Sequence, residues 1–398
     1  MGVRWRQGVH GGLGGRTTAA LLLGCLALFA CGQGAPGSSA TGQGGGAGAS
    51  GAAPAGQPLM AVLEPGGFGQ VAAAHDRVAI VRLDGRSVAK QFFSARAIPR
   101  IGNAAPVMQP EAVSAGGKVY YADGSGQVRS LAPNGAVAAV TRFPLVNPQQ
   151  VLSFAVSPDG SKLVASVFSW PPVHNPPPQT PVQPAFGPGD MALDVYTAVP
   201  GKAPVRVHHQ VWPQTNQLPR DVMQVVAWTA NGPLVTTDTV LGTQQPLPGQ
   251  HFFGHLAGLN QSGDLGQKVG GDACGAVSVT SDETVLCLDQ TFTSASVRNR
   301  EGSLLYSLPS VSGASYQGAV LSPDGQRAVY GSAVIGRDGS KLQLPPQFYT
   351  EGWLDGQTLV GVQFTNQGES DLDLLHISSP RQVTDLGFKG LFVGPVQR

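Results

Sequence analysis

Charged side chains are scarce in this sequence: they make up 12% of its 398 residues and leave a formal net charge of +1. Binding to nucleic acid needs a clustered basic face, so the composition argues against nucleic acid as a partner. No apolar run reaches the ~18–20 residues of a membrane-spanning helix. No long stretch has the 3.6-residue apolar period of an amphipathic helix. What is present from residue 58 onward is a series of short β-rich runs divided by turn residues, which predicts an all-β body.

The N-terminus has the pattern of an export signal. Three arginines precede a short apolar segment, residues 19–30, and Cys31 follows it directly in Leu28-Phe29-Ala30-Cys31. This Leu-x-small-Cys pattern resembles the lipobox of bacterial lipoproteins. The resemblance implies a signal peptide over residues 1–30 and lipidation of Cys31 as the first mature residue. A register ending at Cys25, with a shorter apolar segment, and an ordinary secretory signal with an incidental cysteine remain open.

A tether is expected after Cys31. Residues 32–57 are dominated by Gly, Ala and Ser and contain no charge and no large apolar side chain, so nothing there can offset the entropy of ordering. We therefore predict residues 31–57 as a lipidated cysteine with a flexible tether. The protein is then exported and lipid-anchored, at the outer face of the cell membrane or in the periplasm or outer membrane. Through this lipid, the membrane is an expected binding partner of the protein.

Only two further cysteines remain, Cys274 and Cys287. An even number is expected in an oxidising compartment. Both lie on the arms of one expected hairpin, slightly off the directly opposite position, so a disulfide depends on the register. The alternative is two small buried apolar residues.

A repeated hairpin organises residues 58–398. Ser157-Pro158-Asp159-Gly160 recurs as Ser322-Pro323-Asp324-Gly325; Pro presets φ, Asp bonds to the local backbone and Gly accepts a positive φ. Counted loosely, seven such turns occur, at residues 64–67, 114–117, 157–160, 229–232, 280–283, 322–325 and 354–357. A second series falls later in each unit, at residues 83–85, 133–135, 200–202, 261–263, 300–302, 337–339 and 378–381.

Two turns per unit give four antiparallel strands, A to D. Repeats of ~40–50 residues with four strands each are typical of propeller blades. The Ser-Pro-Asp-Gly hairpins resemble the WD40-like repeats of TolB-type propellers. We predict an all-β β-propeller of seven four-stranded blades, with six or eight as alternatives, and a monomeric body. The first blade is expected to be complete in sequence, with its A strand at residues 59–63. Either this strand or the tail, residues 390–396, should pair across the first and last blades.

Long loops point to a binding face. The A–B and C–D turns of a four-stranded meander share one end, and the B–C and D–A connections share the other. The long connections 170–189 and 239–253 and the link between blades 3 and 4 fall at the second end. Their aromatic, His, Gln and Arg side chains suit binding, which gives the candidate site Trp170, His174, Phe186, Trp212, Arg220, Gln250, His251, Phe252 and Phe253. The alternative is that these loops fold down on the blades and their aromatic side chains form small additional cores.

Catalytic motifs are sparse, and we expect no metal and no cofactor. His251 and His255 are four residues apart, but on a strand that spacing separates them by ~13 Å. Asp371 and Asp373 share a strand face near Glu369, where a cation or a sugar hydroxyl could bind, although a solvated edge explains them as well. No Gly-x-Ser-x-Gly motif occurs.

Binding or scaffolding of a protein, peptide or glycan is the preferred function. The alternative is an extracytoplasmic hydrolase, lactonase-like or carbohydrate-active, with its site at the central channel.

Overall fold

The computed structural model describes residues 58–64, 75–94, 112–174, 185–213, 219, 222–239, 254–289, 294–309, 318–365, 368–380 and 382–396. All of them belong to one compact unit, Ser50–Arg398, and are described here by themselves. They contain thirty strands. None of these residues belongs to a helix that could cross a membrane.

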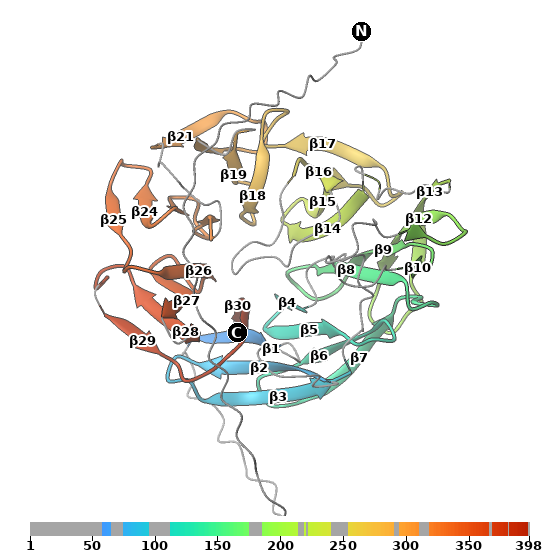
Figure 1. Ribbon diagram of the computed structural model, residues 1–398, viewed down its shortest axis with the longest axis horizontal. Helices are drawn as coiled ribbons and strands as arrows, with labels where there is room; N and C mark the ends of the chain where they lie inside the picture. Colours follow the sequence, from blue (N-terminus) through green and yellow to red (C-terminus); the bar gives the residue numbers. More distant parts are fainter. Residues whose placement is uncertain are drawn as a thin grey trace, which may run out of the picture. The chain divides into compact units, whose positions relative to one another are not determined.

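Seven four-stranded antiparallel sheets form a ring, as the sequence predicts (Figure 1). Six of them, blades 2 to 7, run in chain order from the inner to the outer strand. Blade 2 holds β4 (Ala112–Ala115), β5 (Lys118–Ala122), β6 (Gln127–Leu131) and β7 (Val137–Arg142). Blade 3 holds β8 (Gln150–Val156), β9 (Leu163–Ser169), β12 (Met191–Ala198) and β13 (Val205–Trp212). Blade 4 holds β14 (Val222–Thr229), β15 (Gly232–Thr239), β16 (Leu256–Leu259) and β17 (Leu265–Val269).

The remaining three sequential blades follow the same order. Blade 5 holds β18 (Gly275–Val279), β19 (Val285–Leu288), β20 (Ala295–Arg298) and β21 (Leu304–Leu308). Blade 6 holds β22 (Val320–Leu321), β23 (Arg327–Tyr330), β24 (Ala333–Gly336) and β25 (Lys341–Gln343). Blade 7 holds β26 (Phe348–Trp353), β27 (Thr358–Thr365), β28 (Gly368–His376) and β29 (Val383–Asp385).

The seventh sheet, the closing blade, is built from both ends of the ring. Its inner strand is β30 (Leu391–Val396), followed outward by β1 (Leu59–Glu64), β2 (Asp76–Arg82) and β3 (Ser87–Phe93). The prediction that the first blade is complete in sequence is therefore wrong: β1 is its second strand, and the segment that follows Glu64 connects it to the third strand, β2. The tail is the closing strand. Pairing β30 with β1 removes an edge that would otherwise lie open inside the ring.

The hydrophobic core is divided among the blade interfaces. Each of the seven interfaces holds its own cluster of buried apolar side chains, such as Phe168, Met191 and Val225 between blades 3 and 4. Both faces of every sheet are thus covered by a neighbour. This explains why the strands read as nearly continuous apolar runs instead of the alternation of a half-buried sheet.

The repeated turns have the same contacts in both close copies. Gly160 N donates to Ser157 O at 2.7 Å, and Ser157 Oγ donates to Asp159 Oδ1 at 2.6 Å. Gly160 has φ of 73°, a left-handed conformation that glycine adopts without steric cost. In the second copy Ser322 Oγ donates to Asp324 Oδ1, also at 2.6 Å. The hairpin is therefore a true structural repeat.

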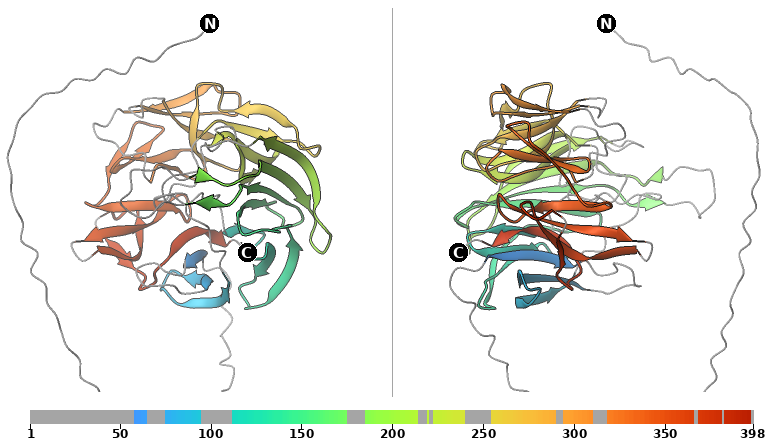
Figure 2. Two further views of the ribbon diagram at one scale, coloured as in Figure 1. Left: turned by 45° about the vertical axis from the view of Figure 1, so that its right-hand side comes forward. Right: turned by 90° about the vertical axis from the view of Figure 1, so that its left-hand side faces the viewer.

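The two ends of the ring differ. We call the end with the A–B and C–D turns the turn face and the end with the B–C and D–A connections the loop face. The right-hand view of Figure 2 shows the ring edge-on, with the C-terminus at one face and the green β10–β11 hairpin projecting from the other. Leu59 pairs with Val396, so the first and last strands of the ring meet at the turn face.

Candidate functional site

The connection between β9 and β12 forms a structure of its own on the loop face of blade 3. It contains a separate two-stranded sheet, β10 (Val173–His174) and β11 (Ala185–Phe186), in which Val173 pairs with Phe186 and His174 with Ala185. Gly187 N donates to Pro172 O at 2.7 Å and closes the base of this hairpin. The backbones of His174 and Phe186 are thereby placed, while their side chains lie outside the described residues.

Trp170 supports the hairpin from below and does not offer a binding surface. Only 2% of it is exposed, and its ring stacks on Phe168 with centroids 6.0 Å apart. Trp212 is half-buried and also packs against Phe168, with ring centroids 6.0 Å apart in a tilted arrangement. The sequence gives Trp170 as a candidate binding residue, with a place in the core as the alternative. In the structure the indole lies in the core between blades 3 and 4, at the end of β9, which matches the alternative.

The base of the hairpin is also bonded to the preceding loop. Trp170 N donates to Gln149 O at 3.1 Å, and Gln150 Nε2 donates to Ser169 Oγ at 3.0 Å. Gln150 Oε1 accepts from Val146 N at 2.6 Å. These bonds fix the link between blades 2 and 3 beside the hairpin. They leave Val146 80% exposed, so a bulky apolar side chain faces solvent at the foot of the hairpin.

The rest of the predicted site is only partly visible. Trp212 ends β13, next to the exposed Val211. Arg220, Gln250, His251, Phe252 and Phe253 lie outside the described residues. The structure therefore brings Trp170 and Trp212 to one core cluster beneath the hairpin, and tests no contact of the other predicted residues with it.

A disulfide lies where the long connection of blade 4 returns to the ring. Cys274, directly before β18, is bonded to Cys287 in β19, with Cα atoms 4.9 Å apart. Ala276 pairs with Cys287 and also forms a bridge with Gly254, the first described residue after that connection. The two cysteines are diagonal neighbours, because Cys274 lies two positions before the partner of Cys287. The disulfide thus sits at the base of a loop-face connection.

No metal centre is found in the part of the chain that the structure describes, where no three His, Cys, Asp or Glu side chains gather closely enough. His209 Nδ1 lies 2.7 Å from Asp194 Oδ1, which Arg206 also approaches at 3.3 Å, on the outer strands of blade 3. Asp373 is buried in β28, whereas Asp371 is half-buried. Asp194 lies on blade 3, whereas Asp371 and Asp373 lie on β28 of blade 7, and neither place gathers three metal-ligating side chains among the described residues.

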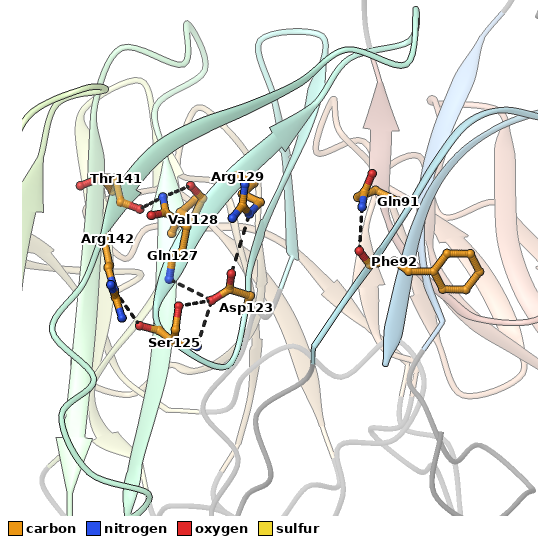
Figure 3. Close-up of polar contacts among 9 residues, drawn as sticks. All are labelled: Gln91, Phe92, Asp123, Ser125, Gln127, Val128, Arg129, Thr141 and Arg142. Carbon is orange, nitrogen blue, oxygen red and sulfur yellow. Dashed lines mark hydrogen bonds and ion pairs between the residues drawn. The ribbon is translucent and has the colours of Figure 1, made fainter. Parts of the chain in front are cut away.

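A polar cluster that the sequence did not indicate lies at the B–C turn of blade 2 (Figure 3). Asp123 Oδ1 accepts from Ser125 N at 2.9 Å and from Gln127 N at 3.2 Å, while Arg129 Nε lies 3.7 Å from Asp123 Oδ2. Arg142 Nε donates to Ser125 O at 3.3 Å. The Asp-x-Ser-x-Gln spacing of an Asx turn could have signalled it. Because the carboxylate is engaged by its own turn, this cluster shapes the loop face.

Comparisons with known proteins assign no family to this chain. No family model matches the chain, and no curated protein matches it. Similar solved structures include an oligogalacturonate lyase in complex with manganese (10% identity, 80% of this chain and 90% of that chain, TM-score 0.45). They also include the Pyrococcus horikoshii acylaminoacyl peptidase (11% identity, 78% and 48%, TM-score 0.44) and BamB from Moraxella catarrhalis (11% identity, 75% and 78%, TM-score 0.37). Identities this low carry no information about the function of this chain.

Proposed function

We propose that this chain is a lipid-anchored extracytoplasmic protein whose propeller binds or scaffolds a protein, peptide or glycan through the loop face of blades 3 and 4. One observation carries the proposal. The β9–β12 connection is built as a separate hairpin on a rigid, packed base, although the blade needs only a short turn there. Loops held up by a rigid scaffold are where binding surfaces usually lie.

The chemistry around the hairpin supports binding. Val146, in the link bonded to the base of the hairpin, and Val211, near the end of β13, are exposed, and Pro171 and Pro172 stiffen the entry to the hairpin. Stiff loops lose less conformational freedom when a partner binds. Isolated exposed valines are ordinary on any surface, but these two both lie at the loop-face end of the ring, which carries the longest connections.

The hairpin can be tested without disturbing the core. Pro171 and Gly187 are buried, so the replacement should span residues 173–186 only, exchanged for a Gly-Ser-Gly linker. We expect the thermal midpoint to change little, because the blade core is retained. Affinity capture from an envelope extract should lose specific partners relative to the unaltered chain. A matched control shortens another loop-face connection, residues 310–317. Equal capture by all three proteins would rule out the β10–β11 hairpin as the binding element.

Anchoring requires a separate test. Cys31→Ser should move the protein from the membrane fraction to the soluble fraction while the ring melts at the same temperature, since Cys31 lies outside the blades. Treatment with globomycin, an inhibitor of lipoprotein signal peptidase, should accumulate a precursor of the unaltered chain. Membrane association that survives Cys31→Ser would show that the anchor is not a lipid on this residue.

A further inference from the structure

Three side chains form a row across the closing blade at the loop face. Glu64 ends β1, Arg77 is its partner on β2, and Phe92 is the partner of Arg77 on β3. Directly paired residues place their side chains on the same side of a sheet, at about 5 Å spacing. The row therefore follows from register alone, although its members are far apart in sequence.

Arg77 is held in one position by its neighbours. Its Nε and Nη2 both donate to the Glu64 carboxylate. Its guanidinium lies 5.6 Å from the ring centroid of Phe92 and 5.4 Å from that of Phe388, which belongs to the connection leading into β30. Guanidinium groups stack favourably on aromatic faces. Arg77, Glu64, Phe92 and Phe388 together form what we call the Phe92 platform.

The platform faces solvent. Phe92 is 56% exposed, and the side chains of Arg77 and Glu64 are 29% and 17% exposed. Figure 3 shows the Phe92 ring pointing away from the polar cluster of blade 2, while Gln91 Nε2 donates to Phe92 O at 2.8 Å. Because Arg77 lies against one face of the Phe92 ring, the exposed part of the ring can contact a ligand. The Nη1 atom of Arg77 has no hydrogen bond to any described residue.

The charges of the platform favour a neutral, polyhydroxylated ligand. An anion would meet the Glu64 carboxylate, and a cation would meet the Arg77 guanidinium. A neutral group that needs both a hydrogen-bond donor and an acceptor finds them here, because Arg77 Nη1 can donate and the Glu64 carboxylate oxygens can accept several hydrogen bonds. Adjacent hydroxyls of a sugar are such groups. The C–H face of a pyranose also fits the negatively polarised face of an aromatic ring.

The size of the platform also fits a sugar better than a protein. Among the described residues, Phe92 is the exposed large apolar side chain of the closing blade. A stable protein interface buries about 800 Å² on each partner around several apolar anchors. One ring with one donor–acceptor pair matches a single pyranose instead.

We propose that the Phe92 platform is a carbohydrate-binding site for a neutral pyranose of a glycan, with the exposed part of the Phe92 ring stacking on the sugar and Arg77 and Glu64 bonding to hydroxyls that extend past the edge of the ring. The site goes beyond the function proposed above, because it lies on the closing blade and uses no residue of the β10–β11 hairpin.

Saturation-transfer NMR on the full folded ring tests this proposal, with cellohexaose, maltohexaose and chitohexaose as probes. At least one should receive saturation at its pyranose protons. Phe92→Ala should weaken that binding by about tenfold, as expected when a stacking contact is lost, while Phe92→Trp should keep it. A hexagalacturonate probe should bind less well than the neutral sugars, because Glu64 repels its carboxylates.

Two controls separate this site from unspecific binding and from the hairpin. Leu304→Ala removes an equally exposed side chain (56%) from blade 5 and should leave the sugar signal unchanged. The replacement of residues 173–186 should also leave the sugar signal unchanged. The outcome for the hairpin therefore does not decide whether the Phe92 platform binds sugar. No transfer to any neutral probe, or transfer that persists in a folded Phe92→Ala variant, would overturn the proposal.

Discussion

Asp159 shows how one side chain sets a turn of the ring. Its carboxylate accepts from Ser157 Oγ at 2.6 Å and from Ser161 N at 3.0 Å. The hydrogen bond from the Ser157 hydroxyl is the main cause that lowers the pKa of Asp159 to about 2, and bonds from Ser161 add to it. The carboxylate form is therefore the one that the folded turn prefers.

The stability contributed by Asp159 should depend on pH. Its pKa is 3.8 without these bonds and about 2 in the fold, so the contribution is complete above about pH 4 and disappears as the pH falls through 2. We expect the difference in unfolding free energy between the unaltered chain and Asp159→Asn to shrink across this window in denaturant titrations.

Asn134 provides the control for Asp159. Ala136 N donates to Asn134 Oδ1 at 3.0 Å in another exposed turn, and this contact carries no titrating group. The effect of Asn134→Ala should be constant over the same pH range. A penalty for Asp159→Asn that did not change with pH would contradict the assignment.

Glu283 occupies a place where the related turns have glycine. Its φ is 64°, compared with 73° for Gly160 and 67° for Gly325. The buried carboxylate accepts from Thr229 Oγ1 at 2.6 Å and lies 2.5 Å from Arg300 Nη1. It thereby joins blades 4 and 5. We infer that these contacts offset the cost of a left-handed conformation in a residue with a Cβ.

Two substitutions separate the contacts of Glu283 from its backbone strain. Glu283→Gly removes the contacts but tolerates the positive φ, and it should lower the unfolding free energy by about 2 kcal/mol, less than a fully buried pair because Arg300 is partly exposed. Glu283→Ala adds steric cost and should lower it by about 1 kcal/mol more. Chemical denaturation measures both. If alanine were the milder change, the strain argument would be wrong.

At the scale of elements, the disulfide joins strands that also anchor a loop. The disulfide links Cys274, directly before β18, to Cys287 in β19. Ala276, the ladder partner of Cys287, both donates a backbone hydrogen bond to Gly254 and accepts one from it. Because Cys274 and Cys287 also pack in the cluster between blades 4 and 5, the bond sits inside a blade interface. Its loss should therefore affect more than one hairpin.

Replacing both cysteines by alanine should lower the unfolding free energy by roughly 2–3 kcal/mol, the range expected for a short disulfide loop. Amide hydrogen exchange should rise first in residues 275–279, which β18 contributes to the ring. Adding a reductant to this variant should have no further effect, which serves as the control. Unchanged stability in the double variant would show that packing alone holds β18.

At the scale of the whole molecule, the last strand holds the ring together. Phe392 N donates to Glu351 Oε2 in blade 7, and Ser114 Oγ in blade 2 donates to Pro395 O. The strand β30 thus bonds to both neighbouring blades as well as to β1. A ring closed in this way should fold as one cooperative unit.

A circular permutant tests this closure directly. Joining Val396 to Pro58 by a short linker and opening the chain between β3 and β4 gives the closing blade four strands in chain order. Since Leu59 and Val396 are paired neighbours, we expect a thermal midpoint within about 3 °C of the unaltered chain. Deletion of residues 391–398 should instead abolish cooperative unfolding. A stable truncated ring would show that β30 is dispensable.

Turn chemistry made most of this fold predictable. The Pro, Asp and Gly residues of the hairpins act locally, so six of the seven first turns and all seven second turns were placed from sequence. The error at residues 64–67 has a physical cause: a local turn pattern cannot show that the strand before it pairs with a segment more than 300 residues away. The same limit applies to Trp170, because the sequence pattern of an aromatic residue in a Pro-rich stretch is the same whether its side chain faces solvent or the core.

The sequence by itself determined the all-β class, the four-stranded repeat and the face on which the long connections fall, because these depend on short-range turn geometry and on the period of the repeat; seven blades was its preferred count, with six and eight left open, and the structure has seven. Only the tertiary structure decided that β30 closes the ring, that Trp170 is buried and that Glu64, Arg77 and Phe92 stand in one row. These features depend on strand register and on contacts between distant blades. No local pattern encodes them, because they exist only once the ring has closed.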